Sequence, residues 1–198
     1  MLDNSNFKKD LKRGIPAEVR GEVWSQFIGN ALRITPNLYE SLLNRVRIAE
    51  ANIDNDLPFK KNIDVIEKDL HRTFSDLGHF RHGGILYNPL KNLLAAFSVF
   101  RTDLGYVQGM SYVAATLILH LGDEYSAFSA FANVMHKYLL FTFYSFDMPK
   151  VNVFFHIYMR LMKIHIPKLH QMFTDVGFQC SVFLFEWTVA VFSNIVPL

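Results

Sequence analysis

Residues 103–121 read DLGYVQGMSYVAATLILHL and combine a turn signal with a helical pattern. Two glycines flank the polar segment around Gln108, and glycine adopts turn conformations that other residues resist. The apolar residues that follow recur at intervals of three and four, the spacing of one face of an α-helix. The stretch therefore predicts a loop that carries Gln108, followed by a buried helix. Its apolar stripe comprises Met110, Val113, Ala114, Leu117, Ile118 and Leu121.

Apolar residues at helical spacing recur on both sides of this stretch. Pro16 and Pro36 stand at first-turn positions, where the missing N–H of proline costs nothing, and Thr35 is placed to cap the second of these helices. Asp123 is placed to cap a later helix. We predict helices from about residues 16, 36, 63, 88, 110 and 123, and near residues 149–164, 167–176 and 181–194.

Three segments complete the prediction of the fold. The apolar residues between Val19 and Ile28 form a stripe that we expect to face the core, whereas residues 50–62 lack periodicity and predict a loop. Residues 141–146, FTFYSF, half alternate as a strand does, but the segment is short and nothing pairs with it. We therefore predict an all-α fold over residues 1–198, with antiparallel helices joined by short loops.

Composition excludes several classes of protein. Hydrophobic residues make up 51% of the chain, enough to bury a substantial core. The formal charge of +2 argues against a nucleic-acid partner, and the basic segment FKKDLKR at residues 7–13 is short. The single cysteine, Cys180, excludes an internal disulfide and lies in an apolar setting that predicts a buried, unreactive thiol. No apolar run approaches the ~20 residues of a membrane span, so we expect no direct membrane insertion and a cytoplasmic protein.

The sequence predicts neither a metal site from its histidines nor a GTP-binding loop of its own. His79 and His82 lie three residues apart, and His165 and His170 flank Pro167, but no cysteine or carboxylate cluster completes either pair. We therefore predict no metal site. The chain has no G-x-x-x-x-G-K-[ST] loop, so it is not expected to bind GTP itself.

Two polar stretches are candidates for chemistry. In IEKDLHRTF, residues 66–74, Asp69 and Arg72 are three apart and can pair on one side of a helix. A surface ion pair of this kind is common and contributes under ~1 kcal/mol, but Arg72 lies in the last turn, where its side chain can reach a partner. Gln108 can donate and accept hydrogen bonds, which suits the orientation of a water molecule. The simpler interpretation is that Gln108 bonds to its own backbone at the helix entry.

Together the two stretches resemble the TBC domain of Rab GTPase-activating proteins. The resemblance rests on an isoleucine followed by D-x-x-R-T-F and, later, on Y-x-Q-G-M. RGIPAEVRGEVW at residues 13–24 resembles the opening motif of that family, and IPKLHQMFTDVGF at residues 166–178, with Trp187 and FSNIVPL, resembles its later helices. The resemblance extends from about Leu11 to the last residue, and three motifs occur in the family's order.

The resemblance implies a function and assigns roles to residues. A TBC protein accelerates GTP hydrolysis by inserting an arginine and a glutamine into the nucleotide site of its partner. By this resemblance Arg72 is the arginine finger, and Gln108 orients the attacking water in place of the GTPase's own glutamine. We expect Asp69 to hold Arg72 in place, with Thr73 as a second support, and Tyr106 to pack beneath the Gln108 loop.

The same resemblance implies the partner. It is a Rab-type small GTPase in its GTP-bound state, which implies a role in vesicle trafficking and recruitment to endomembranes through that partner. No cofactor of the chain's own is expected, because the GTPase carries GTP and Mg²⁺. Gly109 allows the loop to project. Arg20 and Trp24 are four apart, so we expect the guanidinium to lie over the indole and to support the site from nearby.

The chain departs from the family pattern in three places. Ser75 stands where the family usually has proline, which predicts a looser exit from the helix of Arg72, and Val107 replaces a common cysteine. The sequence ends at NIVPL, where the family continues through further helices. We therefore expect a TBC-type domain without its C-terminal helices and with an uncovered apolar face that promotes association.

Two alternatives remain open. One is a TBC domain that binds a Rab GTPase as a scaffold without stimulating hydrolysis. The other is a helical interaction module in which Asp69, Arg72 and Gln108 lie apart. A shared location for these three side chains would favour either TBC interpretation over the interaction module.

Overall fold

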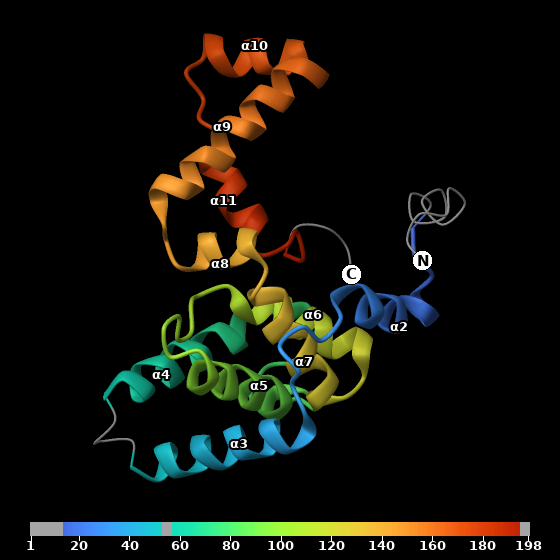
Figure 1. Ribbon diagram of the computed structural model, residues 1–198, viewed down its shortest axis with the longest axis vertical. Coiled ribbons are helices and arrows are strands. Elements are labelled where there is room, and N and C mark those ends of the chain that lie inside the picture. The colour runs from blue at the N-terminus through green and yellow to red at the C-terminus, as the bar shows by residue number, and fades with distance from the viewer. Residues whose placement is uncertain (1–13, 53–56, 195–198) are drawn as a thin grey trace.

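The predicted all-α fold is confirmed by the computed structural model, which describes residues 14–52 and 57–194 (Figure 1). Within these residues the chain is helical and contains no strand. The basic segment 7–13 and the last four residues lie outside the described part. The helices are α2 (Ala17–Ile28), α3 (Pro36–Ala51), α4 (Leu57–Arg72), α5 (Tyr87–Phe100), α6 (Met110–Leu121), α7 (Glu124–Met135), α8 (Tyr138–Tyr144), α9 (Met148–His165), α10 (Pro167–Asp175) and α11 (Ser181–Val189), with a 3₁₀ turn at Ser75–Leu77.

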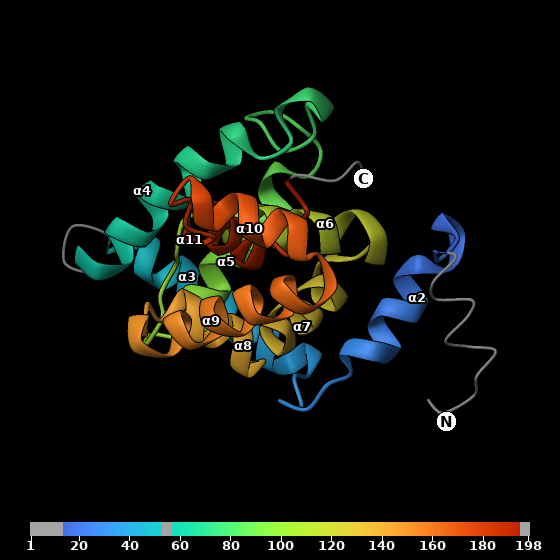
Figure 2. The same ribbon diagram turned by 90° about the horizontal axis from the view of Figure 1, so that it is seen from above.

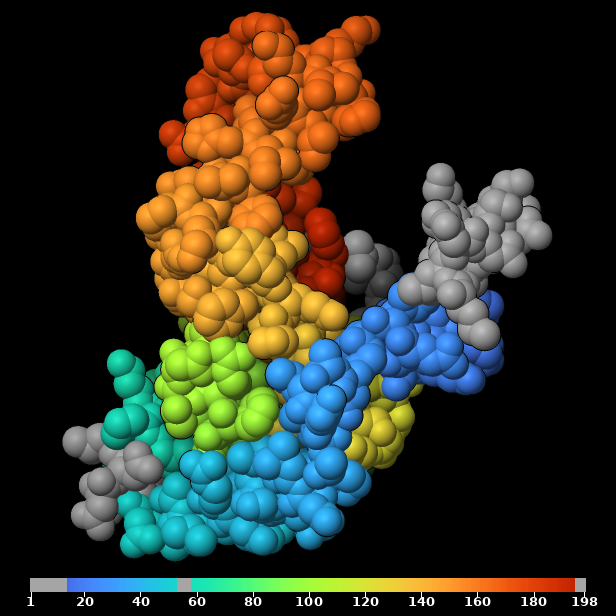
Figure 3. All heavy atoms as spheres, viewed as in Figure 1, coloured from blue at the N-terminus to red at the C-terminus, as the bar shows by residue number. Residues whose placement is uncertain are grey.

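The helices form two groups, which we call the N-terminal and C-terminal units (Figures 1 and 3). In the N-terminal unit, α2 to α7, the helix α5 packs against α3, α4, α6 and α7, and α6 also contacts α2. Leu93, Phe97 and Phe131 are among its fully buried side chains. The view from above shows α9, α10 and α11 lying over α5 and α7 (Figure 2). A large continuous core lies beneath the loop that carries Gln108, because Tyr106 and Met110 on either side of it belong to that core.

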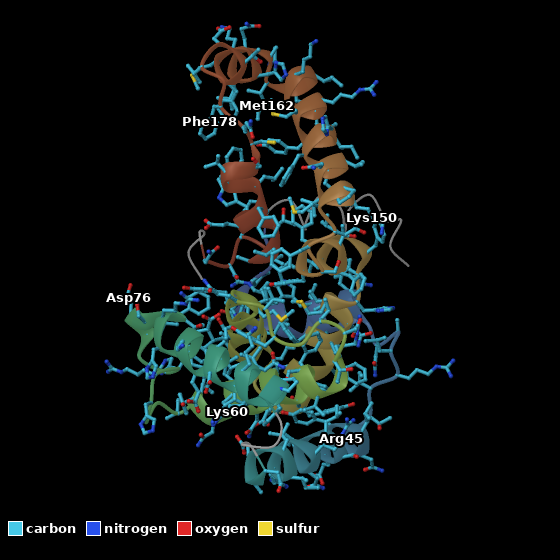
Figure 4. The ribbon with its side chains drawn as sticks, turned by 90° about the vertical axis from the view of Figure 1, so that its left-hand side faces the viewer. Arg45, Lys60, Asp76, Lys150, Met162 and Phe178 are labelled. Carbon is cyan, nitrogen blue, oxygen red and sulfur yellow. The ribbon has the colours of Figure 1, made fainter. Side chains whose placement is uncertain are left out.

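The C-terminal unit, α8 to α11, has a much smaller core of its own, and Leu140 and Tyr144 of α8 belong to the large core. Its buried cluster contains Phe143, Val151, Phe155 and Cys180. Cys180 is buried as predicted, and burial raises the pKa of its thiol. Figure 4 shows the two units from the side, with Arg45, Lys60 and Asp76 on the lower one and Lys150, Met162 and Phe178 on the upper one.

Helix α9 is apolar on two sides. One side packs into the small core, whereas a second stripe is exposed to solvent. The exposed stripe consists of Val153, Ile157, Leu161 and Ile164. Among the described residues, no helix is long and apolar enough to cross a bilayer.

Two predictions about the N-terminal unit are wrong. The loop predicted over residues 50–62 is largely helical, because α3 continues to Ala51 and α4 begins at Leu57. Phe59 is buried one turn before Ile63, so the apolar stripe of α4 begins earlier than the periodicity suggests.

The apolar stripe predicted for α2 faces the core only in part, because Ile28 packs against the core but two other members of the stripe lie at the surface. Val19 and Phe27 are each 44% exposed, and Gly21 is the buried residue of the helix. A Cβ atom at Gly21 would lie 2.0 Å from the carbonyl oxygen of His120 in α6. A close approach of two backbones therefore contributes to the attachment of α2 to α6.

Candidate functional site

The carboxylate of Asp69 connects the two stretches that carry the candidate catalytic residues. Asp69 lies in the last turn of α4 and is 1% exposed. One carboxylate oxygen accepts a hydrogen bond from the guanidinium of Arg72, one helical turn later. The other accepts from the hydroxyl of Tyr106 (2.6 Å) and from the backbone N–H of Gly109 (3.0 Å). A single buried acid in α4 thus binds both the guanidinium of Arg72, in the same helix, and the loop of Gln108.

Tyr106 lies beneath the loop, where the sequence predicted it, and is held from α4 at two points. Its hydroxyl donates to Asp69, and its backbone N–H donates to Oδ1 of Asn62 (3.2 Å). Burial, followed by the charge of Asp69, raises the pKa of Tyr106 well above its ordinary value. The hydroxyl therefore stays protonated and remains a hydrogen-bond donor at neutral pH.

Thr73 contributes in a different way from the one predicted. Its hydroxyl donates to the backbone carbonyl of Asp69 (2.7 Å) and lies 2.7 Å from the hydroxyl of Ser111, with which it shares a hydrogen bond. Both hydroxyls are buried. Thr73 therefore ties the end of α4 to the first turn of α6, and its described contacts are not with the Arg72 side chain.

Gly109 occupies a conformation that favours glycine. It is the N-cap of α6 with φ of 96°, in the left-handed region that side chains rarely adopt. This geometry directs its N–H toward Asp69 and leaves the preceding residue, Gln108, at the surface. The Gln108 carboxamide makes no hydrogen bond with the described part of the chain.

Arg72 and Gln108 line one cavity of about 340 Å³. The Arg72 side chain is 49% exposed, so its guanidinium is anchored by Asp69 and still accessible. Tyr112 adds to the same wall and donates its hydroxyl to the Arg72 carbonyl (3.1 Å). The opposite wall belongs to α11 and includes Phe185, Glu186 and Val189. The shared cavity favours either TBC interpretation over the interaction module.

Arg20 and Trp24 do not lie at this site. Trp24 stacks on the ring of His120, with centroids 4.7 Å apart and planes 9° apart, and Arg20 donates to Nε2 of the same ring (2.9 Å). His120 is in the last turn of α6, whereas Gly109 caps its start, so about 16 Å of helix separates them. The predicted support of the site by these two residues is wrong, because they attach α2 to the far end of α6.

The burial of His120 and the charge of Arg20 lower the pKa of the imidazole. Because a guanidinium can only donate, Nε2 must accept and the ring must be neutral in this arrangement. The contact is therefore sensitive to acid.

Sequence reasoning missed three residues of the site: Asn62, Ser111 and Tyr112. Ser111 and Tyr112 follow the Y-x-Q-G-M stretch directly, so their position in the first turn of α6 was an available signal. Asn62 fell in the segment predicted as a loop, which concealed its place on α4.

The cavity offers a cationic donor and an amide that both donates and accepts. Such groups suit negatively charged oxygens and a bound water molecule, which are the elements of phosphoryl transfer. Within the described ranges, no three His, Cys, Asp or Glu side chains are grouped as a metal site would require. The cationic and amide groups of the cavity can bind negatively charged oxygens and a water molecule.

Comparisons with known proteins show the family of the chain. The family model of the Rab-GTPase-TBC domain matches residues 17–198. TBC1 domain family member 12 of Xenopus tropicalis is 35% identical over 94% of this chain, and member 14 of Homo sapiens is 34% identical over 94%. This chain spans 29% of the length of each of these two relatives.

A solved structure resembles the whole described fold. The Chlamydomonas flagellar RabGAP TBC domain superposes with a TM-score of 0.75 at 22% identity, covering all of this chain and 63% of that one. At this identity the likeness concerns the fold alone.

Proposed function

The chain belongs to the Rab-GTPase-TBC domain family, and on that premise we propose that it activates GTP hydrolysis by a Rab-type GTPase with Arg72 and Gln108 supplied in trans. The observation that carries the proposal is the Asp69 carboxylate, which binds the helix of Arg72 and the loop of Gln108 so that both side chains line one cavity. One buried acid therefore holds the Arg72 guanidinium and the backbone next to Gln108 in a fixed relation to each other.

Arg72 would neutralise charge on the transferring phosphoryl group. An arginine supplied in trans contributes about 10³–10⁵ to the rate, or roughly 4–7 kcal/mol of barrier. Ordering a free arginine side chain costs up to ~2 kcal/mol. The ion pair with Asp69 reduces this cost before the partner arrives, and the half-exposed guanidinium still has donors available for phosphate oxygens.

Gln108 would orient the attacking water. Its carboxamide oxygen can accept from the water while its NH₂ group donates to a phosphate oxygen. Among the described residues the carboxamide has no partner of its own that this step would have to break. The loop itself is anchored on both sides of the glutamine, at Tyr106 and at Gly109.

The GTPase would carry GTP and Mg²⁺, and this chain would contribute protein groups only. A role in vesicle trafficking, and recruitment to endomembranes through a lipid-anchored GTPase, follow from the proposal. The family relationship and the paired side chains support activation rather than passive binding.

The test is phosphate release from a panel of GTP-loaded Rab GTPases. For the GTPase that responds to the wild-type chain, Arg72→Ala should lower the stimulated rate on the order of 10³-fold, and Gln108→Ala about 10²-fold or more. Arg47→Ala and Gln171→Ala are matched controls, since both residues are exposed and neither lines the cavity.

Thermal denaturation of all four variants should match the wild type. Stimulation that survives both Arg72→Ala and Gln108→Ala would reject the assignment. Tight binding of a GTP-loaded Rab without any stimulation would instead favour the scaffold.

A further inference from the structure

Asn62 contacts the Gln108 loop at the end opposite to Gln108. It lies in α4, two turns before Asp69. Its Oδ1 atom accepts the backbone N–H of Tyr106 at 3.2 Å. The same side chain packs against Gly105, where an added Cβ atom would lie 3.1 Å from Oδ1. Gly105 has φ of 61°, so both the conformation and the close contact favour glycine there.

One face of α4 therefore holds the whole loop. Asn62 and Asp69 are seven residues apart, which places them on the same face and about 10 Å from each other along the helix. Asn62 binds the loop where it begins, at Gly105 and Tyr106, and Asp69 binds it at the Tyr106 hydroxyl and at Gly109. Gln108 lies between the two anchor points.

The two anchors differ in what they control. Asp69 binds Arg72 directly, so its loss disturbs both candidate catalytic residues. Asn62 is ten residues from Arg72, or about 15 Å along α4. Its described hydrogen bond is to the loop and not to the guanidinium. Asn62 therefore offers a means of disturbing Gln108 alone.

We infer that Asn62 is a positioning residue for Gln108, an inference that rests on the proposed function. Without its Oδ1 atom, the Tyr106 N–H loses its acceptor and the start of the loop gains freedom. Orientation of a reacting water is sensitive to displacements of about 1 Å, which cost up to ~10²-fold in rate. Asn62→Leu should therefore lower kcat about 10- to 100-fold and leave KM nearly unchanged.

Asn62→Asp is the conservative variant, because it keeps an oxygen acceptor of the same size at the same place. It should restore kcat to within about threefold of wild type, since a carboxylate accepts the same backbone N–H. Asn44→Leu, at an exposed position on α3, controls for the general effect of replacing asparagine with leucine. A purely structural role would not separate kcat from KM in this way.

Hydrogen exchange in the free chain tests the inference without any GTPase. Asn62→Leu should speed exchange of the Tyr106 amide about tenfold or more, whereas Asn62→Asp should not, and α5 amides should be unaffected by either change. Unchanged exchange at Tyr106, or faster exchange throughout α5, overturns the inference. A wild-type chain that stimulates no GTPase would reject the proposed function, and the exchange result would still decide the role of Asn62.

A double-mutant cycle provides the second criterion. If Asn62 acts through Gln108, Asn62→Leu should change the residual single-turnover rate of the Gln108→Ala variant less than twofold. An undiminished effect in that background would show that Asn62 acts by another route and would overturn the inference.

Discussion

The N-terminal and C-terminal units supply opposite walls of the same cavity, but the buried core of the N-terminal unit is much larger than that of the C-terminal unit. The wall with Arg72 and Gln108 rests on a continuous core that runs through α3 to α7 and includes two residues of α8. The wall from α11 belongs to a unit whose own buried cluster is small, and no side chain within α11 itself is fully buried, although Val189 packs against the large core and its carbonyl accepts from the hydroxyl of Tyr144 (2.6 Å). Local stability follows buried apolar contact. The candidate catalytic pair is therefore carried by the firmly packed wall, and we expect the facing wall to be more easily displaced.

The largest expected effect tests this contrast with one substitution in each core. Phe97→Ala should lower the free energy of unfolding by about 3–5 kcal/mol, because Phe97 is fully buried against Phe131. Phe155→Ala should cost less, since Phe155 is 8% exposed and its cluster is small. Urea denaturation followed by circular dichroism gives the two values.

Segment-resolved hydrogen exchange then locates each effect. Phe155→Ala should speed exchange in α8 to α11 and leave α5 protected. If both variants lose the same stability and exchange faster everywhere, the two units unfold as one and the contrast is wrong.

A smaller loss of stability is expected from a substitution in α2, at the edge of the N-terminal unit. Gly21→Ala adds a methyl group against the backbone of α6, which cannot move aside as a side chain can. We expect a net loss of about 1–3 kcal/mol, although alanine favours the helix by up to ~1 kcal/mol. The melting temperature measures the loss, and Ser25→Ala on an exposed position of α2 is the control. Unchanged or increased stability would show that α2 is not tightly packed on α6.

The smallest expected effect depends on pH. The pKa of His120 is lowered from 6.5 in the folded chain, so the unfolded chain binds the proton first as the solution is acidified. This contribution to stability is present above about pH 6.5 and is lost as pH falls through the lower folded pKa. Denaturation curves between about pH 5 and 8 should show the slope, and His120→Gln should reduce it. An identical slope in both proteins would mean that other groups cause it.

The sequence predicted the parts of the fold whose signal is local. The apolar stripes of α5 and α6, the Thr35 and Asp123 caps, and the spacing of Asp69 and Arg72 all act within a few residues of each other. The resemblance to a known family then related the two distant stretches.

The predictions failed where the deciding contact is distant or lacks a side chain. Gly21 attaches α2 through the absence of a Cβ atom, which no pattern of apolar residues reveals. The indole of Trp24 stacks on the ring of His120, 96 residues away, rather than on the guanidinium of the nearby Arg20. Asn62 accepts a hydrogen bond from Tyr106, which is 44 residues away in the sequence. The first residues of α4 lack apolar periodicity, so the sequence did not predict the helix on which Asn62 lies.

The shared carboxylate of Asp69 also has a genetic consequence. A single base change converts an aspartate codon into one for asparagine, and that substitution would replace the charged acceptor of both Arg72 and the Gln108 loop. Because Asp69 is buried, the outer surface of the chain would stay the same. Under the proposed function, this one mutational step would remove activation while the interior of the protein changes and its exterior is preserved.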